Sequence, residues 1–360
     1  MKIFVAGDRY FDPQTVVSGI KDILHDDAVS YDSVLLPYPV DHIPLDDDTL
    51  VPTGMAWDIN MDADYGTQGV REYYGANDTL SGKLGNCDIL VIHGAALPAS
   101  IIDQAPRLKL IGCMRGGPVN IAIDHAAAKG IRITNSPGKN AQGVAEFTIG
   151  LLLAHIRHIP EGNAGLYEGK YVQRYGSYDV LGWELSGKAF GLIGFGRIGQ
   201  ALAPILRGFG CTVYAYDPYM DRNVAEKAGV IPCSLEDVLR QSDVVSLHAR
   251  GRERIMNARE FALMKRGAQF VNTSRGTLVD YQALMDALKS GHLGGAALDV
   301  FGTEPFRFYR ELCALPNVTA TPHMAGISRE TVQRGIAMIG DEIMRFIKGE
   351  ELNYEITLKK

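Results

Sequence analysis

Short, uniformly apolar runs recur along most of the chain and alternate with segments of helical periodicity. Such runs are typical of parallel strands, because helices cover both faces of a parallel sheet and leave no strand position facing water. Helical patterns fall between them, for example over 198–209 and 281–290. The alternation predicts an α/β fold built on parallel sheets. The apolar runs that carry this prediction are 89–92, 110–113, 191–194, 244–247, 269–272 and 296–299.

Three other stretches complete the pattern. Residues 1–7 predict a first strand that runs into a glycine turn, and the apolar run is too short for a signal peptide. The apolar stretch 144–158 predicts a buried helix, because polar residues and a glycine interrupt it too soon for a membrane span. The segment 162–183 is rich in glycine and tyrosine and has no core pattern. We interpret it as an arm that wraps a partner subunit.

The composition is that of a globular protein, with 46% hydrophobic and 22% charged residues. A length of 360 residues exceeds what one hydrophobic core usually organises, so we expect two domains. The net charge of -6 provides no basic stripe, and we expect neither a nucleic-acid nor a membrane partner. The five cysteines are scattered and form no CxxC pair, which indicates reduced thiols and a cytoplasmic location.

The irregular stretch 37–75 is rich in proline, glycine and aspartate, and it includes Asp46, Asp47 and Asp48. Carboxylates are the ligands that Ca²⁺ and Mg²⁺ prefer. No histidine or cysteine stands beside them at ligand spacing. We therefore interpret the stretch as a solvated loop and expect no metal.

A glycine-rich motif follows one of the predicted strands. Gly194, Gly196 and Gly199 form a G-x-G-x-x-G pattern between a strand and an amphipathic helix. The next predicted strand ends in Asp217, about 20 residues after the last glycine, which completes a dinucleotide-binding βαβ unit. Asp217 would accept hydrogen bonds from the ribose hydroxyls and repel a 2′-phosphate, so NAD is the expected cofactor. The alternative is a glycine turn that packs a helix on a sheet without any ligand.

Three charged residues stand directly after strand-like runs. They are Arg275, Glu304 and His323. Open parallel sheets bind their ligands at the carboxyl ends of the strands. Arginine can hold a carboxylate with two hydrogen bonds, and histidine exchanges protons near neutral pH. A glutamate beside the histidine would favour the imidazolium form. The set predicts oxidation or reduction at C2 of a 2-hydroxy or 2-keto acid.

Each of these residues also has an interpretation without catalysis. Arg275 could cap a helix or pair with Asp280. Glu304, which precedes a proline, could be a turn residue. His323 could be a histidine of the core.

Taken as an ordered set, the motifs resemble those of the D-isomer-specific 2-hydroxyacid dehydrogenase family, in its phosphoglycerate-dehydrogenase-like branch. The likeness runs from about residue 87 to residue 326, and as a set it is very specific. The segments that carry it are 194–199, 272–276, 299–305 and 321–323, together with 126–131, 134–138 and 144–146.

The resemblance implies an NAD-dependent dehydrogenase that acts on small D-2-hydroxy acids, phosphorylated and sugar-derived acids included. It implies two doubly wound parallel-sheet domains. A Rossmann NAD domain over 118–324 would be inserted into a flavodoxin-like substrate domain made of 1–117 and 325–360. It also implies a homodimer formed through the NAD domain.

The resemblance further assigns roles to single residues. It implies that Arg275 binds and polarises the substrate, that His323 is the acid/base and that Glu304 is the partner of the histidine. Asp299 would contact the nicotinamide carboxamide. The remaining cofactor contacts that we carry over are Arg197, Ile198 and Thr273.

Two segments depart from the family pattern. The segment 249–254 after His248 is shorter than in the family and unusually basic, so its contacts with NAD are not carried over. Phosphoglycerate enzymes have an Arg-Ser pair where this chain has 93–96, and a different cation, Arg115, stands further on. The substrate therefore need not be 3-phosphoglycerate. The substrate contacts that we predict are Gly94, Ala95, Arg115, Gly116, Gly117 and Arg275.

Two other function classes compete with the dehydrogenase. Formate dehydrogenases share the fold but lack a glutamate at the position of Glu304, which argues against them. An NAD-sensing binding protein, like the corepressors of this family, would retain the same three residues. NADH consumption with a panel of 2-keto acids distinguishes an enzyme from a sensor, because a sensor binds NADH without turnover.

Overall fold

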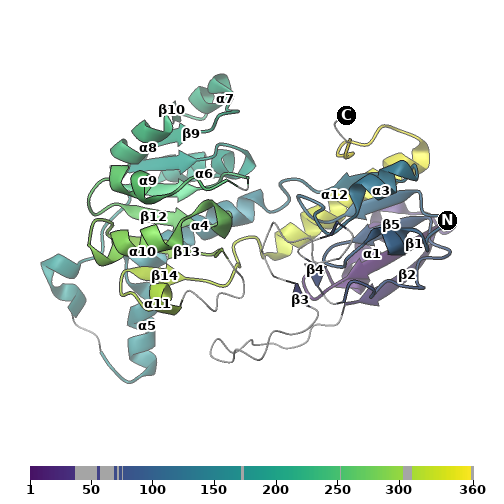
Figure 1. Cartoon of the computed structure of the whole chain (residues 1–360), viewed down its shortest axis with the longest axis horizontal. Coiled ribbons are helices and arrows are strands. Elements are labelled where there is room, and N and C mark those ends of the chain that lie inside the picture. Colours follow the sequence, from purple (N-terminus) through teal and green to yellow (C-terminus); the bar gives the residue numbers. More distant parts are fainter. Residues whose placement is uncertain are drawn as a thin grey trace. The chain divides into compact units, whose positions relative to one another are not determined.

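The computed structural model describes residues 1–36, 55–56, 69–70, 73–74, 76–171, 174–251, 253–302 and 310–357. The chain divides into two compact units (Figure 1). The first consists of Met1–Asn140 and Ile327–Lys360, and the second of Ala141–Gly326. Each is built on a parallel sheet, which confirms the predicted fold class. Within the described residues, no helix is both long and apolar enough to cross a membrane.

The first unit contains a five-stranded parallel sheet with the order β2-β1-β5-β6-β7. Counted along the chain, this is the order 2-1-3-4-5 found in flavodoxin-like folds. A short antiparallel pair, β3 and β4, lies outside this sheet. The strands are β1 (Lys2–Gly7), β2 (Ser30–Leu35), β3 (Met55–Ala56), β4 (Tyr73–Tyr74), β5 (Ile89–Ile92), β6 (Leu110–Cys113) and β7 (Arg132–Asn135).

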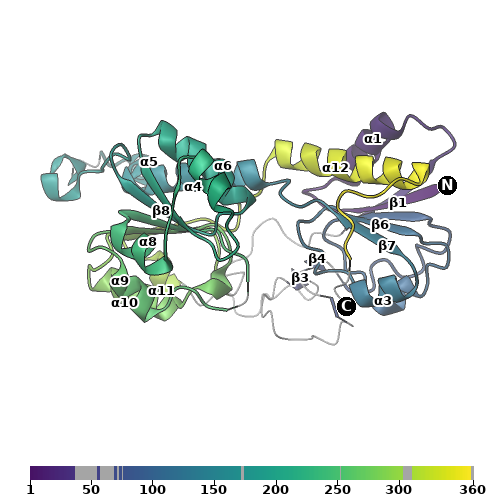
Figure 2. The same cartoon turned by 90° about the horizontal axis from the view of Figure 1, so that it is seen from above.

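Helices cover both faces of this sheet. Side chains that alternate along β1 face opposite sides, so Ile3 and Val5 belong to one core cluster and Phe4 and Ala6 to another. Figure 2 shows α1 and α12 on one face and α3 on the other. The helices are α1 (Pro13–Leu24), α2 (Ala99–Ile102), α3 (Ile123–Ala128) and α12 (Arg329–Lys348).

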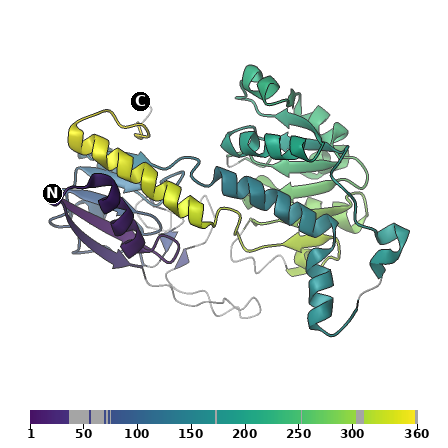
Figure 3. The same cartoon turned by 180° about the vertical axis from the view of Figure 1, so that it is seen from behind.

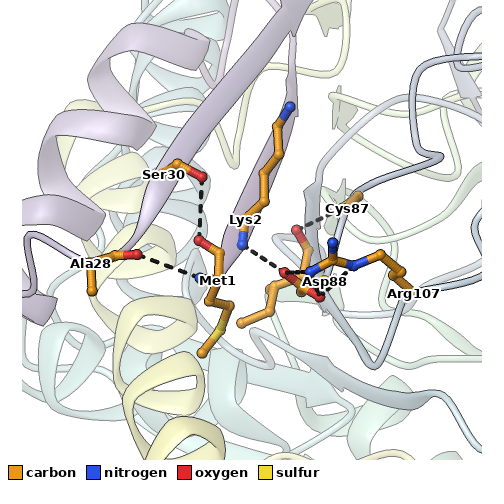
Figure 4. Close-up of polar contacts among 8 residues, drawn as sticks. Met1, Lys2, Ala28, Ser30, Cys87, Asp88 and Arg107 are labelled. Carbon is orange, nitrogen blue, oxygen red and sulfur yellow. Dashed lines mark hydrogen bonds and ion pairs between the residues drawn. The ribbon is translucent and has the colours of Figure 1, made fainter.

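The amino end of the same sheet is closed by a buried carboxylate. Asp88 accepts hydrogen bonds from the amide N–H of Lys2 at 2.8 Å and from the guanidinium of Arg107 at 2.9 Å, as Figure 4 shows. Burial alone would raise the pKa of Asp88, but these hydrogen bonds outweigh it and the pKa is lowered. The carboxylate therefore ties the starts of β1 and β5 together.

The division between the units falls later in the chain than the sequence predicted. We expected the boundary at 117/118, whereas the first compact unit extends to Asn140. The reason is β7, whose residues pair in parallel with those of β6 from Leu110 to Cys113. A strand of only four residues that contains arginine, threonine and asparagine fits either domain, because only its pairing partner assigns it to a sheet.

The second unit contains a seven-stranded parallel sheet with the order β10-β9-β8-β11-β12-β13-β14. Counted along the unit, its first six strands follow the Rossmann order 3-2-1-4-5-6. The strands are β8 (Ala189–Ile193), β9 (Thr212–Tyr216), β10 (Ile231–Pro232), β11 (Val244–Leu247), β12 (Gln269–Asn272), β13 (Gly295–Leu298) and β14 (Val318–Ala320).

Helices again cover both faces of the sheet (Figure 2). α4 and α6 pack on one face, where Leu152, Leu202 and Leu206 are buried in one cluster. α8, α9 and α10 pack on the other, around Phe261 and Phe270. The helices are α4 (Ala141–Ile156), α6 (Arg197–Gly208), α7 (Arg222–Lys227), α8 (Leu235–Gln241), α9 (Ala258–Leu263), α10 (Tyr281–Lys289) and α11 (Arg310–Cys313), with the 3-10 helix η3 (Gly276–Leu278).

An arm leaves the second unit after α4. The predicted helix over 144–158 is present as α4, but it ends at Ile156, and His158 adopts a left-handed φ of 55° before α5 (Ile159–Tyr167) begins. Figure 3 shows α5 and the segment after it standing away from the sheet. That segment contains only the short 3-10 helices η1 (Arg174–Gly176) and η2 (Tyr178–Val180) among its described residues.

Candidate active site

The loop between β8 and α6 holds three glycines in different surroundings. Gly194 has a φ of +100°, and a Cβ there would lie 2.6 Å from the carbonyl carbon of His248. A Cβ on Gly199 would lie 2.6 Å from the carbonyl oxygen of Gly194, so α6 packs directly on the loop. Around Gly196, by contrast, no described atom lies within 4 Å of the Cβ position. This open space beside the N-terminus of α6 fits the pyrophosphate of a dinucleotide.

Asp217 is fixed against this glycine loop. Its Oδ2 accepts the amide N–H of Phe195 at 2.8 Å, and its Oδ1 accepts that of Tyr219 at 2.8 Å. The side chain is partly exposed. Each carboxylate oxygen can accept more than one hydrogen bond, so both can also accept one from a ribose hydroxyl. The predicted contacts Arg197 and Ile198 lie in the first turn of α6.

A further histidine lies beside the glycine loop. His248 follows β11, is 7% exposed, and its Nε2 lies 2.8 Å from the Oγ of Ser246. Burial lowers the pKa of His248 to about 3, so the ring is neutral at pH 7. Its Nδ1 is buried and has no hydrogen-bond partner in the described part of the chain. In the sequence, His248 served only to mark the start of the basic loop, and its burial beside the glycine loop was not predicted.

Three neighbouring strands of the second sheet end in polar residues. β12, β13 and β14 pair in parallel in this order. Arg275 follows the first, Asp299 the second and His323 the third. Adjacent strands lie about 4.8 Å apart, so these residues occupy one edge of one sheet. The other predicted catalytic residue, Glu304, lies outside the described residues.

The turn that carries Arg275 is fixed by the side chain of Asn272. The Nδ2 of Asn272 donates to the carbonyl oxygen of Arg275 at 3.1 Å, and its Oδ1 accepts the amide N–H of Ser274 at 3.0 Å. A Cβ on Gly276 would lie 1.9 Å from the carbonyl carbon of Phe301, so only glycine fits there. The guanidinium of Arg275 is exposed. Its Nη1 donates to the carbonyl oxygen of Ser274 at 2.9 Å. Asp280, its partner in one interpretation of the sequence, instead caps α10 and pairs with Arg254.

Asp299 shapes the turn that carries His323. Its carboxylate is fully buried and accepts the Oγ1–H of Thr321 at 2.6 Å and the amide N–H groups of Met324 and Ala325, both at 2.8 Å. Burial raises the pKa of Asp299, although these hydrogen bonds act against it. His323 has a left-handed φ of 55°, and its amide donates to the carbonyl oxygen of Asp299 at 2.8 Å. The carboxylate thus holds an uncommon backbone conformation in place.

The other predicted cofactor contact has a structural partner. The hydroxyls of Thr273 and Thr148 lie 2.8 Å apart. This bond joins the loop after β12 to α4. A contact between Thr273 and NAD therefore stays a prediction, as does the one assigned to Asp299.

The predicted substrate contacts all follow strands of the first sheet, except Arg275. Gly94 and Ala95 follow β5 and are buried, and the carboxamide of Asn120 donates to the carbonyl oxygen of Ala95 at 2.7 Å. Arg115 and the two residues after it, Gly116 and Gly117, follow β6 and are partly or fully exposed. Their role in substrate binding stays a prediction.

Sequence reasoning also missed a polar group in the first unit. The Nδ1 of His93 lies 2.6 Å from the Oδ2 of Asp8, and both side chains are buried. Lys139 lies nearby and is 7% exposed. Asp8 and His93 directly follow strands, so their positions could have signalled the edge of the sheet. Lys139 stands four residues after β7, outside any motif that we used.

A metal site is not among the features of the described residues. No group of three or more histidine, cysteine, aspartate or glutamate side chains is arranged there to hold an ion. The aspartates 46–48 lie outside that part of the chain. All five cysteines carry free thiols.

Comparison with known proteins identifies the family. Residues 149–325 match the family model described as the D-isomer specific 2-hydroxyacid dehydrogenase, NAD binding domain, and NAD is therefore the cofactor. The chain is 36% identical over 272 residues to a glyoxylate reductase of Korarchaeum cryptofilum, which covers 74% of this chain and 82% of the relative. It is 36% identical over 278 residues to a D-3-phosphoglycerate dehydrogenase of Methanocaldococcus jannaschii, but this match spans 76% of the chain and only 52% of that protein.

Solved structures agree with the sequence relatives. A D-2-hydroxyisocaproate dehydrogenase superposes with a TM-score of 0.77 at 25% identity, and the match covers 99% of this chain and 100% of the other. Its fold is the two-sheet arrangement described above. The matched domain, the relatives and the order of the motifs agree, and the chain belongs to the D-isomer specific 2-hydroxyacid dehydrogenase family.

Proposed function

We propose that this protein is an NAD-dependent dehydrogenase that interconverts a small D-2-hydroxy acid and its 2-keto acid. The observation that carries the proposal is the common edge of β12, β13 and β14. There Arg275, Asp299 and His323 follow three adjacent strands of the sheet that also holds the glycine loop. Arg275, which can bind a carboxylate, and His323, which can donate a proton, thus lie on the domain that binds the cofactor.

Different side chains have different roles in keto-acid reduction. Bound NADH supplies a hydride to C2 of the keto acid. Arg275 binds the substrate carboxylate with its exposed guanidinium and draws electron density from the adjacent carbonyl. His323 donates a proton from its ring to the carbonyl oxygen as negative charge develops there. In the oxidative direction the neutral ring accepts the hydroxyl proton.

Two carboxyl groups support His323 in this proposal. Asp299 fixes the backbone of the turn through the hydrogen bonds described above. Glu304, by resemblance to the family, orients the ring and favours the imidazolium form that donates the proton. Asp299 acts through the backbone and Glu304 through the charge of the ring, so their substitutions should have different effects on the pH profile.

The test is NADH consumption with a panel of 2-keto acids that includes glyoxylate, phosphorylated acids and sugar-derived acids. Turnover of at least one acid, with His323→Gln inactive on it, supports the dehydrogenase. NADH binding in the micromolar range without turnover of any acid would instead support an NAD sensor. Failure to bind NADH would contradict both.

We also propose a cytoplasmic homodimer, formed through the arm of the second unit. The free thiols support the location. The arm exposes large apolar side chains, with Tyr167 87% and Tyr178 88% exposed, which a second copy would cover. Light scattering after size exclusion should give a dimer for the wild type and a monomer for a Leu166→Asp, Tyr167→Asp double variant. A monomeric wild type would contradict the proposal.

A further inference from the structure

Lys139 is a buried lysine without an acceptor for its charge in the described part of the chain. Its side chain is 7% exposed, and its Nζ lies 4.8 Å from the ring centroid of Phe11 and 5.6 Å from that of Tyr10. Within the described residues, Nζ makes no hydrogen bond and no ion pair. Aromatic rings stabilise a cation only in part. Burial of an ammonium group is unfavourable unless a counter-charge accompanies it, so the native protein retains an incompletely compensated charge here.

The position of this lysine is fixed from two sides. The Nε of Arg334, on α12, donates to the backbone carbonyl oxygen of Lys139 at 2.6 Å. A Cβ on Gly335 would lie 2.9 Å from the ring of Phe11 and 3.2 Å from the Cδ of Lys139. The helix therefore packs against both the ring and the aliphatic stem. The backbone and the aliphatic stem of Lys139 are thereby held in place.

The groups that face Lys139 do not neutralise it. The pKa of Lys139 is lowered to about 8, mainly by burial, and the neighbouring cations of Arg115 and Arg334 act in the same direction. Asp8 and Cys113 act in the opposite direction. Burial, however, raises the pKa of the Cys113 thiol to about 11, so it is uncharged at neutral pH.

The carboxylate of Asp8, which acts on Lys139, already has other partners. Asp8 lies 2.6 Å from the ring of His93 and also accepts the amide N–H groups of Tyr10 and Phe11 at 3.0 and 2.9 Å. The pKa of Asp8 is lowered despite its burial, because the ring of His93 and these amides favour the carboxylate. The charge of Asp8 is therefore shared among groups that it already contacts.

All these groups lie at the carboxyl edge of the first sheet. Asp8 follows β1, His93 follows β5, Arg115 lies two residues after β6, and Lys139 lies in the loop after β7. The four strands are neighbours and parallel. This is the edge at which open parallel sheets bind ligands.

We propose that Lys139 is the central cation of an oxyanion-binding site in the first unit, with Arg115 as its second cation. The ligand is a carboxylate or a phosphate group. Resting on the proposed function, this oxyanion is a second anionic group of the substrate, in addition to the carboxylate at C1. The protein thus acts on dianionic 2-hydroxy acids.

The oxyanion site can be tested without turnover, by calorimetric titration with inorganic phosphate and with malonate. Lys139→Met should weaken binding at least about tenfold, while Lys109→Met, which removes an exposed lysine of the same unit, should leave it unchanged. Binding to the wild type should decline as the pH rises through about 8, because the ammonium group loses its proton. Lys139→Arg should bind at higher pH as well, since a guanidinium stays charged.

Thermal unfolding separates binding from a purely structural role. Lys139→Met removes a buried charge and preserves the length of the stem, so without anions its melting temperature should equal or exceed that of the wild type. Phosphate should raise the melting temperature of the wild type only. Absence of phosphate and malonate binding to the wild type, or equal binding to Lys139→Met, would overturn the site. A large loss of stability in Lys139→Met without anions would show that the lysine serves packing.

The substrate part of the proposal needs matched keto acids. For a pair that differs only in a distal carboxylate or amide, wild-type kcat/KM should favour the dianion by about 10–100-fold. Lys139→Met should remove this preference through KM, with kcat changed less than about threefold. Turnover of both acids with equal efficiency would contradict the preference for a dianionic substrate but would still support the dehydrogenase activity. Absence of turnover with every acid would contradict the proposed dehydrogenase activity. The phosphate titration would still show whether the oxyanion site at Lys139 exists.

Discussion

The two sheets use the charged groups at their carboxyl edges differently. In the second unit, Asp217 and Asp299 accept hydrogen bonds from the backbone with both carboxylate oxygens, so their charges hold loops in shape. In the first unit, the ammonium of Lys139 contacts only aromatic rings among the described residues. These two carboxylates serve the backbone of the second unit, whereas Lys139 of the first unit retains its charge for a ligand. We therefore expect substitutions in the second unit to change chemistry and cofactor binding, and those in the first to change substrate choice.

The largest effect should follow the loss of His323. His323→Gln should lower kcat about 10²–10⁴-fold, the usual contribution of a positioned acid/base, and leave the Kd for NADH unchanged. Single-turnover kinetics and fluorescence titration with NADH measure the two quantities. His125→Gln, in the first unit, serves as control. Wild-type turnover in His323→Gln would mean that another group carries the proton.

The next effect should come from the open space at Gly196. Gly196→Ala places a methyl group where the pyrophosphate fits, and overpacking of this size should raise the Kd for NADH about 10–100-fold. The melting temperature without cofactor should not fall, because the site has room and φ is -73°. Gly199→Ala, whose Cβ meets the backbone, should instead lose stability. Equal losses of stability in both variants would contradict this assignment of the space.

A smaller effect should appear at Asp217. Asp217→Ala removes the repulsion of a 2′-phosphate, so the preference for NADH over NADPH should narrow about tenfold, the equivalent of about 1.4 kcal/mol. The ratio of kcat/KM for the two cofactors measures it. Because the carboxylate also accepts the amide of Phe195, binding of NADH itself should weaken as well. A wild type that uses both cofactors equally would show that Asp217 does not select.

The smallest effect should be on stability, at the amino edge of the first sheet. There the carboxylate of Asp88 accepts hydrogen bonds from Lys2 and Arg107. Asp88→Asn should lower the free energy of unfolding at pH 7 by about 1 kcal/mol, a modest value because Arg107 is largely exposed. Since the pKa of Asp88 is lowered by folding, its contribution is present above the unfolded pKa and lost as the pH falls through the folded one. The unfolding free energies of the two proteins, measured in denaturant, should therefore converge as the pH falls below the ordinary pKa of an aspartate. A constant difference across this range would contradict the assignment.

The same contrast explains what the sequence could predict. The glycine loop, Asp217 and the strands on either side were predicted because dinucleotide binding depends on backbone geometry, which demands glycine at fixed spacing. Arg275, three residues after the strand run 269–272, was predicted because charged residues that follow parallel strands mark the edge at which ligands bind. The pattern of apolar runs also predicted the parallel α/β fold, and the chain length predicted two domains. It could not decide which sheet holds β7, because pairing involves residues far apart in sequence.

The first unit was less predictable, because its polar edge is assembled from separate loops. Asp8, His93 and Lys139 come from three strands, and no spacing in the sequence relates them. The tertiary packing determines that Asp8 is hydrogen-bonded to His93. It also places the ring of Phe11 next to the ammonium of Lys139. The role of Asp299 is a similar case, since its carboxylate is used by a turn about 25 residues away. The type of a residue and its position after a strand predict that it lies at the carboxyl edge of a sheet. Which residues distant in sequence it contacts there follows only from the three-dimensional fold.

The insertion of the second unit has a consequence for synthesis on the ribosome. α12 packs on the face of the first sheet that α1 shares, and Ile339 fills the space over Gly112, where a Cβ would lie 2.8 Å from its Cγ2. Some 300 residues separate the two helices, so at usual elongation rates the growing chain exposes the face around Ile3 and Val5 for roughly 15–60 s. The second unit, which is continuous in sequence, can fold completely in that interval. Translation speed should therefore affect the yield of the first unit more than that of the second.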